Sequence, residues 1–169
     1  MPTVGFIGLG NMGGPMAANL QRRGFDLAVF DTLAEAMARL TQLGARAANG
    51  VPGAAQSDIG VTMLPDPATV QAVVLGEGGI LANSRKGQIV LDMSTVDPGT
   101  TDLIAAKAAE RGVGVVDAPV GRLVTHAEKG ESLFMVGASD ADFQRVLPLL
   151  QAMGSTIHHC GPVGTGTRT

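Results

Sequence analysis

The fold is decided by the stretch Phe6-Ile7-Gly8-Leu9-Gly10-Asn11-Met12-Gly13-Gly14-Pro15-Met16-Ala17-Ala18-Asn19-Leu20. The apolar run at residues 4–7 predicts a buried strand, and this run is broken by two glycines. Apolar side chains then recur four residues apart up to Leu20, which is the spacing of one helix face. The stretch therefore predicts a strand, a tight turn and a helix in direct succession.

The glycines of this turn have the spacing G-x-G-x-x-G, which carries a specific chemistry. Gly8 permits the tight turn, Gly10 has no side chain to block a pyrophosphate, and Gly13 lets the helix approach the strand closely. Free N–H groups and the dipole at the helix start favour a phosphate. The alternative is a tight turn of an α/β protein without a ligand. The strand before the turn and the helix after it favour a dinucleotide site.

Asp31 supports the same interpretation, because it follows the predicted second strand at residues 27–30. A carboxylate at that position can accept hydrogen bonds from the adenosine ribose hydroxyls. It would repel the additional phosphate of NADP, and no Arg directly follows it in Thr32-Leu33. The sequence therefore predicts NAD, with NADP the less favoured cofactor. A helix cap or a solvated turn residue is the alternative role of Asp31.

Composition narrows the class of protein. The 169 residues are enough for one domain, residues 1–169, and 45% of them are hydrophobic. The net charge is −3 and no Lys/Arg cluster occurs, which disfavours nucleic acid and anionic membrane partners. A single cysteine, Cys160, forms no internal disulfide and fits a cytoplasmic location. No signal peptide and no membrane-length apolar run are expected.

Strands and helices alternate along the chain, which predicts an α/β fold, a doubly wound and mostly parallel sheet of the Rossmann type. Further strands are expected at residues 45–48, 59–64, 88–93, 113–116, 132–137 and 155–158, and helices at residues 33–43, 51–56, 68–75, 98–111 and 141–153. The carboxyl ends of the strands should meet in one cleft. Nothing in the glycine-rich tail, residues 161–169, is expected to pack as a terminal element. We interpret it as a cut end or as the entry to a second domain.

Five blocks of the sequence resemble the β-hydroxyacid dehydrogenase family, which includes the 3-hydroxyisobutyrate dehydrogenases. They are the opening stretch, Met63-Leu64-Pro65, Asp92-Met93-Ser94-Thr95, Asp117-Ala118-Pro119-Val120 and Phe134-Met135-Val136-Gly137. The blocks occur in the family's order and cover essentially the whole chain. The resemblance implies an NAD-dependent oxidation of a small 3-hydroxy acid, or the reverse reduction of its semialdehyde.

The resemblance also assigns roles to residues. It places Gly8, Leu9, Gly10, Asn11, Met12 and Gly13 at the pyrophosphate, Asp31 at the ribose, Met63, Leu64 and Pro65 on the adenosine side, and Thr95 at the nicotinamide. The family's catalytic Lys would fall just past Thr169, so no catalytic residue is assigned within this chain. The resemblance implies an all-helical C-terminal domain, which is expected after Thr169 and not within residues 1–169, and which would make the full-length enzyme a homodimer or homotetramer.

One departure from the family concerns the substrate. Most members continue the Asp-Ala-Pro-Val block with Ser-Gly-Gly, whereas this chain continues with Gly121-Arg122-Leu123. An Arg suits a carboxylate, phosphate or sulfonate, and this pair resembles the sulfolactaldehyde reductases of the family. Those reductases usually have Thr after the Arg, where this chain has Leu123. Gly121, Arg122 and Ser94 are therefore expected to contact a small anionic semialdehyde or hydroxy acid.

Two other interpretations of the function stay open. One is a 3-hydroxyisobutyrate or tartronate semialdehyde enzyme in which Arg122 binds a carboxylate, and the other is an isolated, non-catalytic NAD-binding module. A surface role or a salt bridge is the alternative for Arg122. His126 lies in the loop after Arg122 and is more often a solvated residue in such a place. His158, His159 and Cys160 alternate between strand faces, so we expect no metal site.

Overall fold

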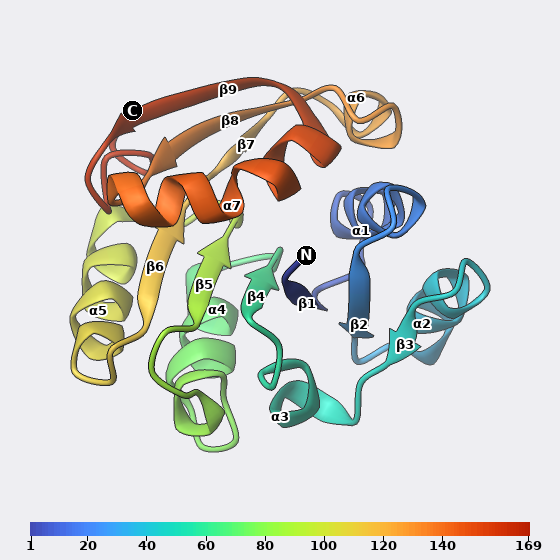
Figure 1. The fold of residues 1–169 in the computed structure, drawn as a ribbon, viewed down its shortest axis with the longest axis horizontal. Coiled ribbons are helices and arrows are strands. Elements are labelled where there is room, and N and C mark those ends of the chain that lie inside the picture. Colours follow the sequence, from blue (N-terminus) through green and yellow to red (C-terminus); the bar gives the residue numbers. More distant parts are fainter.

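The computed structural model describes residues 1–169. Its strands are β1 (Thr3–Ile7), β2 (Asp26–Phe30), β3 (Arg46–Ala47), β4 (Ile59–Thr62), β5 (Ile89–Asp92), β6 (Gly114–Asp117), β7 (Val120–Gly121), β8 (Ser132–Gly137) and β9 (Gly154–Gly161). Its helices are α1 (Gly13–Arg22), α2 (Ala34–Thr41), α3 (Gly50–Ala54), α4 (Pro67–Leu75), α5 (Pro98–Ala109), α6 (Val124–Glu128) and α7 (Asp140–Met153), with a 3₁₀ turn at Leu81–Asn83. The strands form one sheet in the order β3-β2-β1-β4-β5-β6-β8-β7, with β9 paired to β8. Figure 1 shows this arrangement.

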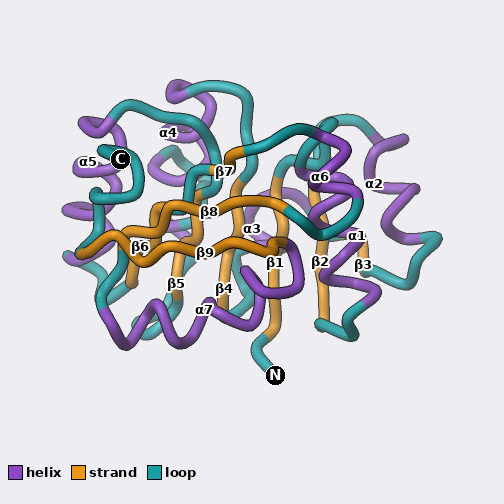
Figure 2. Tube along the Cα trace, turned by 90° about the horizontal axis from the view of Figure 1, so that it is seen from above, coloured by secondary structure: helices purple, strands orange, loops and turns teal.

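The sheet is parallel from β3 to β6, which confirms the prediction of a mostly parallel α/β fold. Every residue of β4 and β5 is buried, as expected for strands covered on both faces. One apolar core joins the sheet to α1, α2 and α7, and a second joins it to α3, α4 and α5. Figure 2 shows α4 and α5 on one side of the strands and α7 on the other.

The last third of the chain departs from uniform parallel pairing. Strand β8 runs antiparallel to β6 and β7, and β9 then runs parallel to β8. The short elements β7 and α6 were not among the predicted elements, because two and five residues give too little periodicity to detect. Strand β9 is longer than the predicted 155–158, because it pairs with β8 from Ser132 to the last residue of that strand, Gly137.

Helix boundaries follow local capping chemistry. Asp66 accepts a hydrogen bond from the Thr69 N–H at 2.8 Å, so α4 begins at Pro67 rather than at residue 68. Asp97 caps α5 in the same way, through the Thr100 N–H at 3.0 Å. The bond from Thr69 lowers the pKa of Asp66, and bonds from the Thr100 hydroxyl and N–H lower the pKa of Asp97. None of the helices combines the length and the apolar character that crossing a bilayer requires.

The prediction that the tail does not pack is wrong. The backbone N–H groups of Gly164 and Thr167 donate to the Asp117 carboxylate at 2.7 and 2.8 Å. Arg168 forms a salt bridge with Asp102 at 2.6 Å. The glycines that made the tail resemble a loose end instead allow close packing, because a side chain at Gly166 would collide with backbone oxygens of Met135 and Asp117.

Candidate functional site

The carboxyl ends of the central parallel strands meet at one edge of the sheet. From β1 the chain runs outward to β2 and β3, and it then crosses back to β4 on the other side of β1. This is the switch point at which open α/β sheets bind ligands. Three hollows line the edge, beside Asp31, beside the glycine loop and beside Thr95.

The glycine loop has two packed glycines and one open glycine. Gly8 has a φ of +101°, and a side chain there would collide with the Met63 carbonyl. A side chain at Gly13 would collide with the Gly8 carbonyl, so this glycine keeps α1 close to the turn. At Gly10 an added Cβ would meet no heavy atom within 4 Å. The open space is therefore at the position where the sequence predicts a pyrophosphate.

The backbone of the loop can hold an anion. The N–H groups of Asn11 and Met12 donate to no protein acceptor, and both residues line the hollow beside Gly10. Helix α1 begins directly after them, with no acidic residue in its first turn. Unpaired N–H groups at the positive end of a helix dipole favour a phosphate. The residues present thus fit the pyrophosphate of a dinucleotide.

Asp31 joins the end of β2 to the glycine loop. One carboxylate oxygen accepts from the Leu9 N–H at 2.8 Å, and the other accepts from the Leu33 N–H at 2.8 Å. Asp31 lines a hollow of about 290 Å³ together with Gly8 and with Met63, Leu64 and Pro65, as the resemblance implies for the adenosine side. Phe30, Val51, Thr69 and Val73 line the same hollow and were not predicted. Phe30 ends β2, Val51 lies in α3, and Thr69 and Val73 lie in α4, so no shared sequence pattern indicated them.

Ser94 has a structural place at this edge. Its hydroxyl oxygen accepts from the Leu64 N–H at 2.8 Å, and its own N–H donates to Asp92 at 3.0 Å. The Asp92 oxygen also accepts from the Thr62 hydroxyl at 2.9 Å. Burial raises the pKa of the Asp92 carboxyl. Ser94 is buried and does not line the hollow beside Thr95. Its hydroxyl instead holds the backbone at Leu64 in place. A substrate contact by Ser94 stays a prediction.

The hollow beside Thr95 has a volume of about 300 Å³. Thr95 and Gly121 line it, and their predicted contacts with the nicotinamide and the substrate stay predictions. The tail residues Gly166, Thr167 and Thr169 also line it, and the prediction of an unpacked tail had missed them. The full lining is completed by Val96, Pro119, Val120, Leu133 and Met135.

Arg122 does not line this hollow. Its guanidinium donates to the Glu131 carbonyl at 2.8 Å, to the Ser155 hydroxyl at 3.0 Å and to the Thr156 hydroxyl at 2.9 Å. These bonds fasten the loop after β7 to β9. Arg122 also has a φ of +76°, a left-handed conformation that is unusual for a residue with a side chain. Its role as an anion contact stays a prediction.

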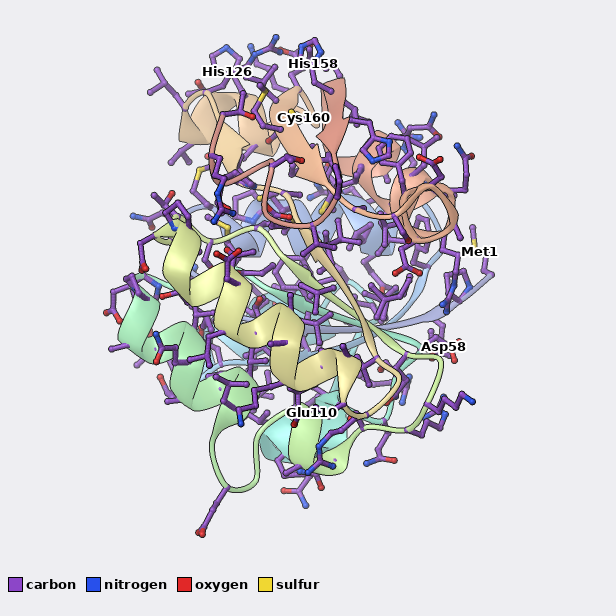
Figure 3. All side chains as sticks on the ribbon, turned by 90° about the vertical axis from the view of Figure 1, so that its left-hand side faces the viewer. Met1, Asp58, Glu110, His126, His158 and Cys160 are labelled. Carbon is purple, nitrogen blue, oxygen red and sulfur yellow. The ribbon has the colours of Figure 1, made fainter.

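The remaining candidates lie away from the strand-end hollows. Figure 3 shows His126, His158 and Cys160 at the top of the view, and none of the three lines a strand-end hollow. The His126 ring accepts from the Leu123 N–H at 3.2 Å, which caps α6 locally. The His159 ring stacks on Phe143 at 4.2 Å. No group of three or more His, Cys, Asp or Glu residues is placed to hold a metal ion.

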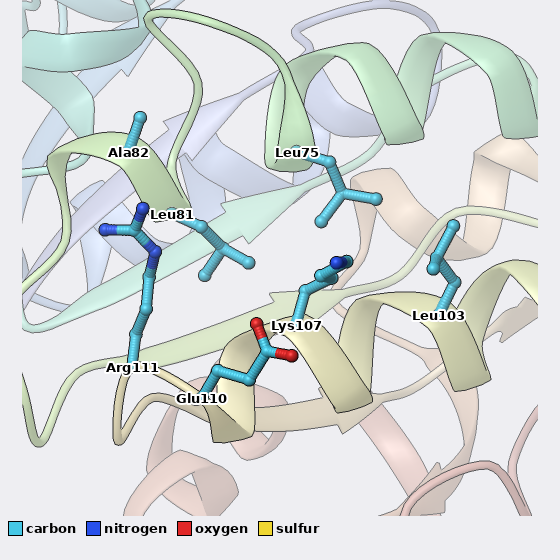
Figure 4. A pocket seen from close by; sticks show the side chains of 7 residues that line it. All are labelled: Leu75, Leu81, Ala82, Leu103, Lys107, Glu110 and Arg111. Atoms are coloured by element: carbon cyan, nitrogen blue, oxygen red, sulfur yellow. The ribbon is translucent and has the colours of Figure 1, made fainter.

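A further hollow of about 360 Å³ lies between α4 and α5, and Figure 4 shows its lining. The lining comes from the C-terminal parts of these helices and from the 3₁₀ turn, with Leu75, Leu81, Lys107 and Arg111 among it. These helix ends lead toward the amino ends of the next strands. The hollow therefore lies at the edge of the sheet opposite the glycine loop and does not contribute to the candidate dinucleotide site.

The strand, glycine loop and helix at the switch point define a Rossmann-type dinucleotide-binding domain. Residues 3–161 match the family described as the NAD binding domain of 6-phosphogluconate dehydrogenase. The chain belongs to this family, and within it to the NAD-binding domains of the 3-hydroxyisobutyrate dehydrogenase-like proteins.

Three relatives illustrate the similarity. A Dictyostelium discoideum protein named probable mitochondrial 3-hydroxyisobutyrate dehydrogenase is 46% identical over 97% of this chain and 51% of its own. The 3-sulfolactaldehyde reductase of Escherichia coli (strain K12) is 40% identical over 99% of this chain and 57% of its own. A solved structure of Mycobacterium tuberculosis 3-hydroxyisobutyrate dehydrogenase with L-serine has a TM-score of 0.92 and 34% identity, covering 99% of this chain and 57% of that one. The chain thus spans about half the length of the curated relatives it matches.

Proposed function

We propose that this domain binds NAD for a dehydrogenase of small β-hydroxy acids, acting either on the alcohol or on the corresponding semialdehyde. The observation that carries the proposal is the open space at Gly10 between the packed Gly8 and Gly13. NAD supplies the hydride acceptor of such a reaction, and its reduced form supplies the hydride for the reverse. The loop backbone from Gly8 to Met12 would hold the pyrophosphate, and Thr95 would lie on the nicotinamide side.

The choice of cofactor rests on Asp31. Its carboxylate lines the hollow of the adenosine side, where it would accept bonds from ribose hydroxyls and repel a 2′-phosphate. We expect NADH to bind at least about tenfold more tightly than NADPH, and Asp31→Ala to narrow the difference. Isothermal titration with both cofactors measures this.

Asp26→Ala is the matched control for the cofactor experiment. It removes the same charge from the opposite end of β2, where Asp26 forms an exposed salt bridge with Arg46. The preference for NADH should stay the same in this variant. Equal affinities of the unaltered chain for the two cofactors would contradict the role of Asp31.

Proton transfer calls for a group that these hollows do not supply. Among the residues lining the three strand-end hollows, Asp31 is the only ionisable one, and it lies on the adenosine side. We therefore expect the 169-residue chain to bind NADH and to transfer hydride negligibly. Stopped-flow absorbance with NADH and a semialdehyde tests this. Measurable turnover would show that the proton-transfer group lies within these residues.

A non-catalytic NAD-binding module is the alternative function. It shares the cofactor site and differs in having no turnover in any longer form of the protein. Assaying a polypeptide that continues past Thr169 separates the two functions. Hydride transfer by that polypeptide supports the dehydrogenase, and binding without turnover supports the module.

The substrate class that we propose depends on Gly121 and Arg122. We propose a small anionic substrate, with 3-sulfolactaldehyde as the first compound to test. The support is the Gly-Arg pair and the 40% identity to the E. coli protein of that name. To contact a ligand, the Arg122 guanidinium would exchange its bonds to Glu131, Ser155 and Thr156 for bonds to the anion.

Substrate rates decide between the sulfonate and carboxylate forms of this proposal. The longer polypeptide should be assayed with 3-sulfolactaldehyde, 3-hydroxyisobutyrate and tartronate semialdehyde. Arg122→Ala should raise KM for the preferred compound, because the anion loses a charged partner. Unchanged rates for every compound would contradict a role of Arg122 in anion binding.

A further inference from the structure

Asp117 holds the tail of the chain in place. This residue ends β6 and is only 1% exposed. One of its carboxylate oxygens accepts from the Gly164 N–H at 2.7 Å, and the other accepts from the Thr167 N–H at 2.8 Å. The Thr167 hydroxyl lies 3.2 Å from the second oxygen. A buried carboxylate thus binds two backbone groups that follow it by 47 and 50 residues.

Glycines make this contact close. A side chain at Gly166 would collide with the backbone oxygens of Met135 and Asp117. A side chain at Gly137, on β8, would collide with the Asp117 carboxylate. The tail therefore lies directly against the ends of β6 and β8, with no side chain between the two backbones.

A second contact fixes the end of the tail. Arg168 donates to both carboxylate oxygens of Asp102 on α5, at 3.1 and 2.6 Å. It also donates to the Gly164 carbonyl at 3.1 Å. This contact is exposed, so the buried bonds of Asp117 supply the stronger constraint.

The held segment is one wall of the hollow beside Thr95. Gly166, Thr167 and Thr169 face that space together with Gly121. The adenosine side of the edge has no contact with the tail, since its hollow is lined by residues of the glycine loop, β2, α3, α4 and the Met63–Pro65 loop. The position of the tail should therefore matter for the nicotinamide and substrate half of the site and not for the adenosine half.

We propose that Asp117 is a positioning residue, which shapes the nicotinamide and substrate side of the site by fixing the backbone of residues 164–167. The role rests on the proposed function, because it presumes that a dinucleotide crosses this edge. It is not a catalytic role, since both carboxylate oxygens are occupied by backbone N–H groups. Asp117 would act through the tail.

Comparing two ligands tests this role with the 169-residue chain. ADP-ribose lacks the nicotinamide and reports on the adenosine and pyrophosphate half alone, whereas NADH also reaches the side walled by the tail. In Asp117→Asn, one acceptor oxygen is replaced by an NH₂ group that faces an N–H donor. We expect NADH to bind at least about threefold more weakly, and ADP-ribose to change by less than about twofold. Amide exchange of Gly164 and Thr167 should accelerate at least about tenfold.

A second variant keeps the test decisive if Asp117→Asn fails to fold. Thr167→Pro removes the N–H donor from the tail and leaves β6 unchanged, so it should reproduce the selective loss of NADH. Thr165→Ala is the matched control, because the Thr165 hydroxyl bonds only the Pro162 carbonyl and does not line the hollow. Asp92→Asn changes the register neighbour of Asp117 on β5 and should leave exchange of the tail amides unchanged.

The outcomes separate this role from the proposed function. Selective weakening of NADH in both Asp117→Asn and Thr167→Pro supports the positioning role. Faster tail exchange with an unchanged ratio of NADH to ADP-ribose affinity would overturn it, because Asp117 would then only stabilise the tail. Unchanged tail exchange would overturn it as well. Failure of the unaltered chain to bind ADP-ribose would overturn the proposed function itself, and the positioning role with it.

Discussion

Gly10→Ala separates cofactor binding from folding. The added methyl group would meet no heavy atom within 4 Å, and Gly10 does not adopt a left-handed conformation. The free energy of unfolding should therefore change by no more than about 0.5 kcal/mol. Gly10 lines the same hollow as Asn11 and Met12, so we expect the same methyl group to compete with a pyrophosphate for that space. Affinity for NADH should fall at least about tenfold, which corresponds to about 1.4 kcal/mol.

Gly13→Ala is the matched comparison, because it adds the same methyl group three residues later. There the Cβ would collide with the Gly8 carbonyl, so α1 and the turn would have to move apart. Overpacking of this kind costs about 1–3 kcal/mol of stability. Gly13→Ala should therefore lower the free energy of unfolding, whereas Gly10→Ala should not.

Urea unfolding and a titration of NADH fluorescence measure the two quantities on the same samples. The expected pattern is lost affinity with retained stability for Gly10→Ala, and lost stability for Gly13→Ala. Wild-type affinity in Gly10→Ala would refute the placement of the pyrophosphate at this loop. Wild-type stability in Gly13→Ala would refute the close packing of α1 on the turn.

Three further substitutions test electrostatics and strain. Burial raises the pKa of Asp92, so the native state favours the protonated carboxyl and the chain loses stability as pH rises above the ordinary pKa of an aspartate. Asp92→Asn should therefore gain stability relative to the unaltered chain as pH rises. Hydrogen bonds from Thr100 lower the pKa of Asp97, so Asp97→Ala should lose stability at neutral pH and lose less as acid protonates the carboxyl. Arg122→Gly should destabilise the chain less than Arg122→Ala, because only glycine adopts a φ of +76° without strain. Urea unfolding across pH checks the first two, and at one pH the third; differences of opposite sign would contradict each.

The cofactor edge could be predicted because its determinants are local in the chain. The glycine loop follows β1 directly, and Asp31 and the Met63–Pro65 loop each follow a strand of the same parallel sheet. Parallel pairing brings such strand ends to one edge whatever the helices between them contain. The structure places Asp31, Leu64 and Pro65 around one hollow, and their contacts with a cofactor stay a prediction.

The part of the edge beside Thr95 could not be predicted in the same way, because contacts between residues far apart in the sequence build it. The tail depends on Asp117, which lies 47 residues before the first N–H group that it binds. The direction of Arg122 depends on Ser155 and Thr156, which become neighbours only when β9 pairs with β8. Neither contact has a periodicity or a spacing that a sequence displays.

This difference bears on how the two halves of the site can vary. Bonds among β1, β2 and β4 hold the glycine-loop part of the edge, whereas β7, β9 and the tail hold the part beside Thr95. A substitution in the tail or in β9 can therefore reshape the space beside Thr95 without moving the glycine loop. Relatives whose names specify 3-hydroxyisobutyrate, 3-sulfolactaldehyde or L-serine all align with nearly the whole of this chain. We therefore expect substitutions that loosen the tail contact of Asp117 to alter the walls of the space beside Thr95 while the glycine loop keeps its place.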